Sequence, residues 1–249
     1  MLNVFSYTDI AEAGVAILNP LSIEKQQLLG ELAELRPGQR VLDLACGKGE
    51  LLCQYAATHG VTGIGIDIHP AFINEANARA VQLGVEGRTE FQVGDAGVYE
   101  SDERFEVVSC LGASWIADGF AGTIDLMARA LKPDGRLLIG EPFVETPTSS
   151  DGLRQHPGFS NLEGIVDRVE KSGFELVEMV VASREDWDRY ASRHWDRAAR
   201  WVRQHPDHPD AAEVVEWTDR ARRRYLTDER AWMGWGVFVL ATRPTVASS

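Results

Sequence analysis

A strand that runs directly into a turn of small residues and then into a helix constrains this chain more than any other feature. Residues 41–51 read VLDLACGKGEL, with small residues Ala45, Gly47 and Gly49 in the turn and a helix that begins near Glu50. Because these turn residues carry little or no side chain, a ligand can approach the backbone and the exposed N–H groups at the helix start. Taken alone, the turn is also compatible with an ordinary tight strand-to-helix connection.

A carboxylate at the end of the next strand favours the ligand-binding interpretation. The segment TGIGID at 62–67 ends in Asp67, where it is placed to accept hydrogen bonds from two ribose hydroxyls. A dinucleotide fingerprint GxGxxG from Gly47 would need a glycine at the position of Leu52. Asp43 would repel a pyrophosphate but suit a ligand with an ammonium and a sulfonium. Together these residues predict a site for S-adenosylmethionine (SAM).

At this point the chain resembles the class I SAM-dependent methyltransferases. Asp43, Ala45, Gly47 and Gly49 match that family's DxGxGxG loop, with alanine in place of the first glycine, and Asp67 matches its ribose-binding acid. The resemblance covers about residues 36–145 and resumes at GFELVEMVVA and WGVFVLATR, which are similar to the sixth and seventh strands. The motifs GASWI and GEPF resemble an uncharacterised bacterial group of small-molecule methyltransferases within this superfamily.

The resemblance implies further cofactor contacts. FQVGDA ends a third strand at Asp95, where the family uses a carboxylate to accept from the adenine amino group, with Ala96 beside the ring. We also assign Ile68 and Cys110 to the cofactor-binding residues. The implied fold class is α/β: a Rossmann-like, seven-stranded, mostly parallel sheet with helices on both faces and a helical insertion between strands six and seven.

The alternation of apolar strands with helical segments agrees with that fold. We expect strands near 40–44, 62–67, 89–93, 105–110, 135–140, 174–181 and 235–242, and helices near 22–35, 50–58, 70–83, 121–131 and 161–172. Continuous apolar strands such as VVSCL and RLLIG are typical of a parallel sheet covered on both faces. Ligands then bind at the carboxyl ends of the strands.

Composition limits the class of partner. The formal net charge of −13 argues against a nucleic-acid partner, because a polyanion is bound through a basic surface. No apolar run approaches the roughly 20 residues that cross a bilayer, and the first 20 residues lack a basic start, so we expect no membrane partner and a cytoplasmic location. The three cysteines show neither disulfide nor zinc spacing, so no metal is expected. We expect a monomer or a homodimer.

The departures from a minimal methyltransferase lie in two segments of one domain that spans 1–249. Residues of about 1–21, which include Tyr7 and Asn19, are expected to form an N-terminal lid. The insertion at about 183–230 predicts two helices broken at HPDHP (205–209), and the last residues, TVASS, predict a loose tail. Aromatic residues at helical spacing in the insertion either pack against the sheet edge or cap the acceptor site: Trp187, Tyr190, His194, Trp195 and Trp201.

Two residues are candidates for the chemistry at the acceptor. Glu141 follows LLIG at a strand's carboxyl end and is our candidate base, although pairing with an arginine or capping a helix explains it equally well. Trp115 either forms a wall against the methyl donor, stacks a planar substrate or is simply a packed aromatic residue. We predict methyl transfer from SAM to an O, N or C nucleophile of a small molecule. The alternatives are a SAM-binding regulator without methyltransferase activity and a nicotinamide-dependent oxidoreductase.

Overall fold

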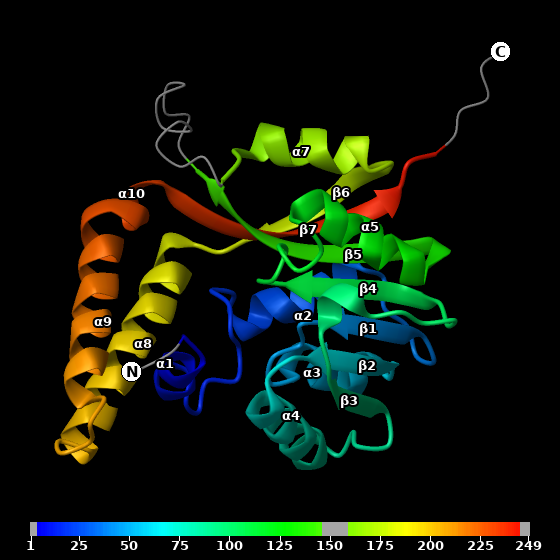
Figure 1. Cartoon of the computed structure of the whole chain (residues 1–249). Coiled ribbons are helices and arrows are strands. Elements are labelled where there is room, and N and C mark those ends of the chain that lie inside the picture. Colours follow the sequence, from blue (N-terminus) through cyan, green and yellow to red (C-terminus); the bar gives the residue numbers. More distant parts are fainter. Residues whose placement is uncertain (1–3, 146–158, 245–249) are drawn as a thin grey trace.

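Seven strands form one mixed sheet with helices on both faces in the computed structural model, which describes residues 4–145 and 159–244 (Figure 1). The strand order is β3-β2-β1-β4-β5-β7-β6. Strand β7 runs antiparallel to both β5 and β6, and the other pairings are parallel. The predicted mostly parallel, seven-stranded α/β fold is therefore confirmed. The tail predicted at 245–249 lies outside the described residues.

The strands are β1 (Arg40–Leu44), β2 (Thr62–Asp67), β3 (Thr89–Val93), β4 (Phe105–Leu111), β5 (Leu131–Val144), β6 (Phe174–Val181) and β7 (Met233–Thr242). The helices are α1 (Val4–Ala11), α2 (Ile23–Leu32), α3 (Glu50–His59), α4 (Pro70–Leu83), α5 (Phe120–Ala130), α7 (Leu162–Lys171), α8 (Arg184–Gln204), α9 (Ala211–Arg224) and α10 (Arg230–Trp232). Two shorter helical segments are the 3-10 turn η1 (Ala96–Val98) and the π-helical turn η2 (Tyr225–Glu229).

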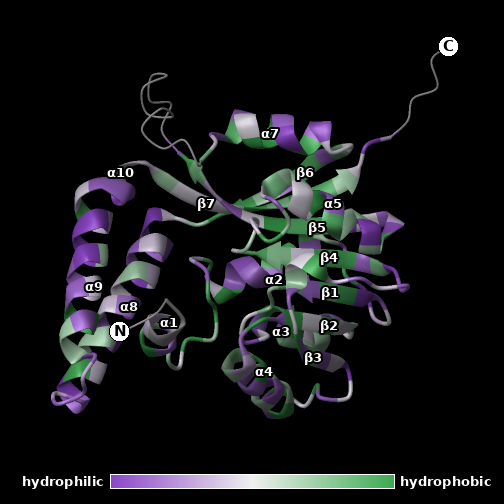
Figure 2. Ribbon diagram, in the orientation of Figure 1, coloured by the Kyte–Doolittle hydropathy of each residue, from purple (hydrophilic) through white to green (hydrophobic). Residues whose placement is uncertain are grey.

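The sheet has an apolar core on each face because its central strands are buried on both sides. On one face, side chains of α2, α3 and α4 pack with alternate strand residues such as Val41 and Leu138. On the other, α5 and α7 pack with residues such as Leu42 and Ile139. Figure 2 shows the apolar colouring concentrated in these strands, whereas α8 and α9 carry many polar residues. Strand alternation thus decides which layer each side chain joins.

Most element boundaries agree with the sequence-based expectation to within two residues. Helix α2 ends at Leu32 rather than near 35, and larger differences occur in the lid and in the fifth strand. The lid contains the helix α1, which the sequence analysis did not assign. The fifth strand begins at Leu131 rather than near 135, because pairing with β4 jumps from Leu131 to Arg136. Pro133, Asp134 and Gly135 therefore form an irregularity inside a longer strand, which also continues to Val144 rather than ending near 140.

The insertion forms the predicted pair of helices, α8 and α9. Helix α8 begins with a capping box, in which the Ser183 hydroxyl accepts from the Asp186 N–H and the Asp186 carboxylate accepts from the Ser183 N–H. The histidines of the connection are turn residues, with His205 at the C-cap of α8. Both helices stand with α1 at one end of the sheet (Figure 1). The insertion therefore packs on the lid, and not only on the sheet edge as the packing interpretation expected.

Candidate active site

A pocket of about 570 Å³ lies at the carboxyl ends of β1, β2 and β4. It is lined by the loop between β1 and α3, by the end of β2, by the loop after β4 and by residues of the lid. The lid contributes Thr8, Glu12, Ala16, Ile17, Leu18 and Asn19. The carboxyl ends of parallel strands are where α/β folds bind ligands, so the pocket lies at the position that the sequence predicts.

The loop between β1 and α3 needs left-handed backbone at three small residues. Ala45 and Gly47 each have φ of 55°, and Gly49 has φ of 69°. A Cβ atom at Gly47 would lie 2.9 Å from Leu18 Cδ1 of the lid, whereas one at Gly49 would lie 2.6 Å from the Phe91 ring. Gly47 therefore lets the lid approach the loop, and Gly49 lets α3 pack closely on the sheet.

Replacing Ala45 by glycine is expected to stabilise the protein by up to about 1 kcal/mol. An alanine pays a steric cost in the left-handed region that glycine avoids. Urea unfolding of the two proteins measures the difference. An unchanged or lower stability would mean that the greater freedom of glycine in the unfolded chain outweighs the strain.

Asp67 holds the loop in place from the end of β2. Its Oδ2 accepts the Gly47 N–H at 2.8 Å, and its Oδ1 accepts the His69 N–H at 2.8 Å. The residue is only 8% exposed and lines the pocket. Since each carboxylate oxygen has a second lone pair, both can still accept from a ligand hydroxyl.

Asp43 is buried beneath the same loop, within β1 rather than in the turn. The Ser109 hydroxyl donates to its Oδ1 at 2.6 Å. Burial is the main cause that raises the pKa of Asp43 to about 7, and the nearby Asp67 charge acts in the same direction. A buried carboxylate that borders the pocket is suited to a cationic ligand, because a nearby positive charge favours its ionised form. The pocket therefore suits a sulfonium or ammonium ligand.

Comparison with known proteins identifies the family. A family model described as a methyltransferase domain matches residues 35–194. The chain belongs to this methyltransferase family. It is 42% identical to Uncharacterized protein YjhP of Escherichia coli over 94% of this chain and 97% of that protein. A SAM-dependent methyltransferase from Geobacter sulfurreducens, crystallised with S-adenosylhomocysteine (SAH), is 40% identical and superposes with a TM-score of 0.91, covering 98% of this chain and all of that one (100%).

A more distant relative has an assigned reaction. The chain is 29% identical to the 27-O-demethylrifamycin SV methyltransferase of Amycolatopsis mediterranei over 69% of its own length. It covers 65% of that protein, slightly less than two thirds.

The remaining predicted cofactor residues occupy different positions relative to the pocket of this methyltransferase. Ile68 lines the pocket and is 59% exposed. Asp95 is exposed at the start of η1, where its Oδ1 accepts the Gly97 N–H at 2.9 Å, and Ala96 beside it is buried. Cys110 is buried in the core on the α5 and α7 face, so only its backbone could reach a ligand. Contacts from these residues to the cofactor stay predictions.

Glu141, the predicted base, does not line the pocket. Its side chain is on the α5 and α7 face of the sheet, where it accepts a hydrogen bond from the Ser114 hydroxyl. The guanidinium of Arg168 lies 3.7 Å from its other carboxylate oxygen and 4.3 Å from the Phe120 ring centre. Burial raises the pKa of Glu141. The structure thus favours the alternative that the sequence left open, pairing with an arginine, and the catalytic role stays untested.

Four polar residues of the pocket were missed by the sequence analysis: Thr8, Glu12, Gln26 and Lys48. The Glu12 carboxyl lines the pocket, and burial raises its pKa to about 7 despite the nearby Lys48 ammonium. Gln26 of α2 is 2% exposed and its Oε1 has no hydrogen-bond partner. Lys48 Nζ donates to the Glu12 carbonyl at 2.9 Å. Only Lys48 had a local signal, its place in the small-residue loop; Glu12 and Gln26 reach the site through tertiary folding.

Within residues 4–145 and 159–244, no cluster of three or more His, Cys, Asp or Glu side chains could hold a metal ion. None of the helices described there is long and apolar enough to cross a membrane. Three exposed arginines of α9, Arg220, Arg222 and Arg224, pair with nearby carboxylates, as in the 3.7 Å contact between Arg220 and Glu216. Such pairing is typical of a solvated helix face.

Proposed function

We propose that this methyltransferase transfers the methyl group of SAM to an O, N or C nucleophile of a small molecule. The observation that carries the proposal is one pocket that joins the β1–α3 loop and Asp67 to the exposed side chain of Trp115. Its volume of about 570 Å³ is within the range of small-molecule sites, roughly 300–1,000 Å³. The SAH bound to the Geobacter sulfurreducens relative supports SAM as the cofactor.

The residues of the pocket suit the parts of this cofactor. Bound SAM supplies an electrophilic methyl group on a positively charged sulfur. Asp67 would accept from the ribose hydroxyls, and the buried carboxylate of Asp43 would lie near the positive charges of SAM. The lid and the loop after β4 would exclude water from the pocket. The unpartnered Gln26 Oε1 is a buried acceptor that an N–H or O–H group of a ligand would satisfy.

Glu12 replaces Glu141 as our candidate proton acceptor. It lines the pocket, whereas Glu141 is on the other face of the sheet. A carboxyl whose pKa is raised to about 7 is matched to taking a proton from an O–H or N–H nucleophile near neutral pH. Once Glu12 has taken this proton, the O or N atom of the small molecule can attack the methyl carbon of SAM.

A small molecule is favoured as the acceptor over a polyanion. The net charge of −13 disfavours nucleic acid, and the relative that methylates 27-O-demethylrifamycin SV is named for a small-molecule substrate. A cytoplasmic location, and a monomer or homodimer, stay predictions from the sequence.

Incubating the purified protein with methyl-labelled SAM and a bacterial metabolite extract tests the proposal. We expect a labelled small molecule, together with SAH, that is absent when the protein is heat-denatured. Titration calorimetry with SAM and NADH should give binding heat for SAM only. Binding of SAM without any labelled product would favour the alternative of a SAM-binding regulator, and binding of NADH instead would favour an oxidoreductase.

Trp115→Ala is expected to impair acceptor use while leaving SAM affinity within about twofold. The Trp115 side chain lines the pocket but is 68% exposed, so it is available to a planar acceptor beyond the cofactor loop. Loss of one aromatic contact predicts that KM rises on the order of tenfold for the methyl acceptor that the labelling experiment identifies. An unchanged KM would mean that Trp115 only forms the rim of the pocket.

A further inference from the structure

The lid is held between the pocket and the helical insertion. Its inner side contributes Glu12, Leu18 and Asn19 to the pocket. Its outer side faces α8 and α9, which stand beside α1 at the same end of the sheet (Figure 1). Contacts from α8 and α9 that hold the lid therefore also hold the lid residues that line the pocket.

Two side chains of α8 bind the backbone of the lid directly. Arg197 donates from Nε to the Ala13 carbonyl at 2.5 Å and from Nη2 to the Gly14 carbonyl at 3.2 Å. The Tyr190 hydroxyl donates to the Leu18 carbonyl at 3.2 Å. Arg197 and Tyr190 are two helical turns apart on α8, so both reach the lid from one face. Their contacts flank the segment that contains the pocket residues Ala16 and Ile17.

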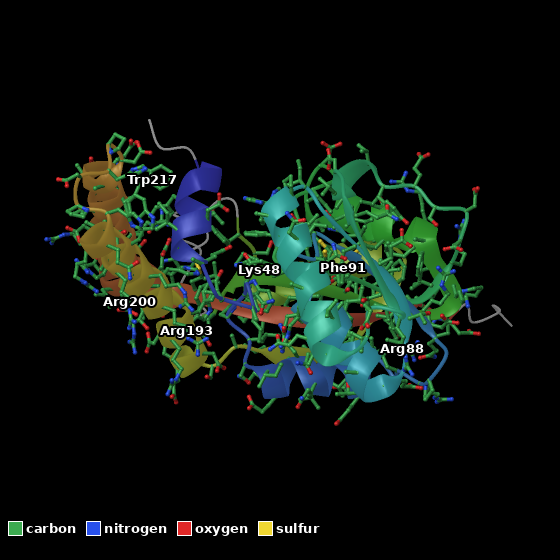
Figure 3. The ribbon with its side chains drawn as sticks, turned by 90° about the horizontal axis from the view of Figure 1, so that it is seen from below. Lys48, Arg88, Phe91, Arg193, Arg200 and Trp217 are labelled. Carbon is green, nitrogen blue, oxygen red and sulfur yellow. The ribbon has the colours of Figure 1, made fainter. Side chains whose placement is uncertain are left out.

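An aromatic contact with α9 fixes α1 as well. The Tyr7 and Trp217 ring centres are 5.1 Å apart, and Tyr7 Oη lies 3.4 Å from Thr218 Oγ1. Ile10 packs on the same small cluster, which contains the buried Ala198 of α8. Figure 3 labels Trp217 on α9, beside the lid helix. The two helices thus bind both α1 and the segment after it.

On its inner side the lid contacts the cofactor loop. Lys48 donates to the Glu12 carbonyl at 2.9 Å, and Leu18 occupies the space that a Cβ atom at Gly47 would need. The contacts run from α8 through the lid to the loop between β1 and α3. Within the described lid, the segment after α1 has few hydrogen bonds of its own, so side chains from outside decide where it lies.

We propose that Arg197 and Tyr190 are positioning residues, which hold the lid over bound SAM and thereby slow its dissociation. The predicted cofactor contacts all precede the insertion in sequence, which suggests that the insertion and SAM binding are independent. The contacts of the lid link them. The inference rests on the proposed cofactor and is independent of which acceptor is methylated.

The test compares SAH binding to Arg197→Ala with binding to a matched variant, Arg200→Ala. Arg200 is on the same helix (Figure 3), its side chain is 66% exposed, and it pairs with Asp196 at 2.8 Å. Both variants remove one arginine from α8, but only the first removes contacts with the lid. Calorimetry gives the Kd, stopped-flow fluorescence gives the dissociation rate, and hydrogen exchange reports the lid amides in the SAH complex.

We expect Arg197→Ala to raise the Kd of SAH about tenfold through faster dissociation, because charge-assisted hydrogen bonds are lost. The lid amides should exchange faster, and Arg200→Ala should stay within twofold of the unaltered protein. Arg197→Lys should recover part of the affinity, since an ammonium can donate to one carbonyl. These changes in lid exchange and dissociation distinguish positioning from a general loss of stability.

Equal SAH binding and equal lid exchange in Arg197→Ala and Arg200→Ala would overturn the inference. If Arg197→Ala does not fold by circular dichroism, Tyr190→Phe decides, because it removes one oxygen and one contact with the lid. Its dissociation rate should rise about threefold, and an unchanged rate would overturn the inference. No SAH binding by the unaltered protein would overturn the cofactor assignment itself, a separate and recognisable result.

Discussion

Asp67→Ala is expected to weaken SAM binding by about 2–4 kcal/mol, a factor of roughly 30 to 1,000. The substitution removes the carboxylate that would accept from the two ribose hydroxyls. It also removes the acceptors of the Gly47 and His69 N–H groups, both at 2.8 Å, so the cofactor loop loses its support from β2. The lost ribose contact and the lost support of the loop therefore both weaken SAM binding.

Calorimetric titration with SAM measures this loss, and circular dichroism checks the fold. Asp67→Asn is the matched variant, since it keeps the size of the side chain and one acceptor oxygen but loses the charge. It should bind SAM with intermediate affinity. Titration heats equal to those of the unaltered protein would show that Asp67 makes no contact with the ribose and that SAM binding does not need its support of the loop.

The sequence was sufficient for the sheet and the cofactor loop because local chemistry determines both. Strands β1, β2, β3 and β6 have the predicted boundaries, although only β1 and β2 are mostly apolar and buried. Glycine at 47 and 49 permits the left-handed backbone found there, whereas the left-handed Ala45 has no such signal in its residue type. The start of β5 could not be predicted, because the sequence does not show that Leu131 already pairs with Phe105 of β4 before the Pro-Asp-Gly irregularity.

The faces of the sheet explain why Glu141 does not line the pocket. Side chains two residues apart share one face of a strand, so Glu141 is on the side of Ile139 and Phe143. Those residues pack under α5 and α7, on the face that binds Arg168. The sequence shows this alternation, but it does not show which face borders the pocket. Cys110 is buried on the same face of β4 for the same reason.

The sequence predicts a lid but not its contacts, because these contacts join residues that are far apart in the chain. Arg197 and Tyr190 meet carbonyls of residues 13–18, and a backbone carbonyl has no residue-specific signal. The aromatic spacing in the insertion did predict a helix with one packed face. It did not predict that part of this face packs on α1.

Gly49→Ala is expected to lower the free energy of unfolding by about 3 kcal/mol. Alanine pays about 1–2 kcal/mol for left-handed backbone, and overpacking adds about 1–3 kcal/mol. The new Cβ atom would lie 2.6 Å from the Phe91 ring and 2.8 Å from the Ala76 Cβ atom. The ring can turn, but Ala76 is fully buried in α4, so relief requires α3 and α4 to separate.

Gly84→Ala separates the two contributions. Gly84 ends α4 with φ of 66°, close to the 69° of Gly49, but a Cβ atom there would meet nothing within 4 Å. Gly84→Ala should lower the free energy of unfolding by only about 1 kcal/mol, the cost of the left-handed backbone alone. Urea unfolding with equal m-values makes the two losses comparable. Equal losses would show that Phe91 and Ala76 move aside cheaply, in which case the loop needs glycine at 49 only for its backbone and not for the packing of α3.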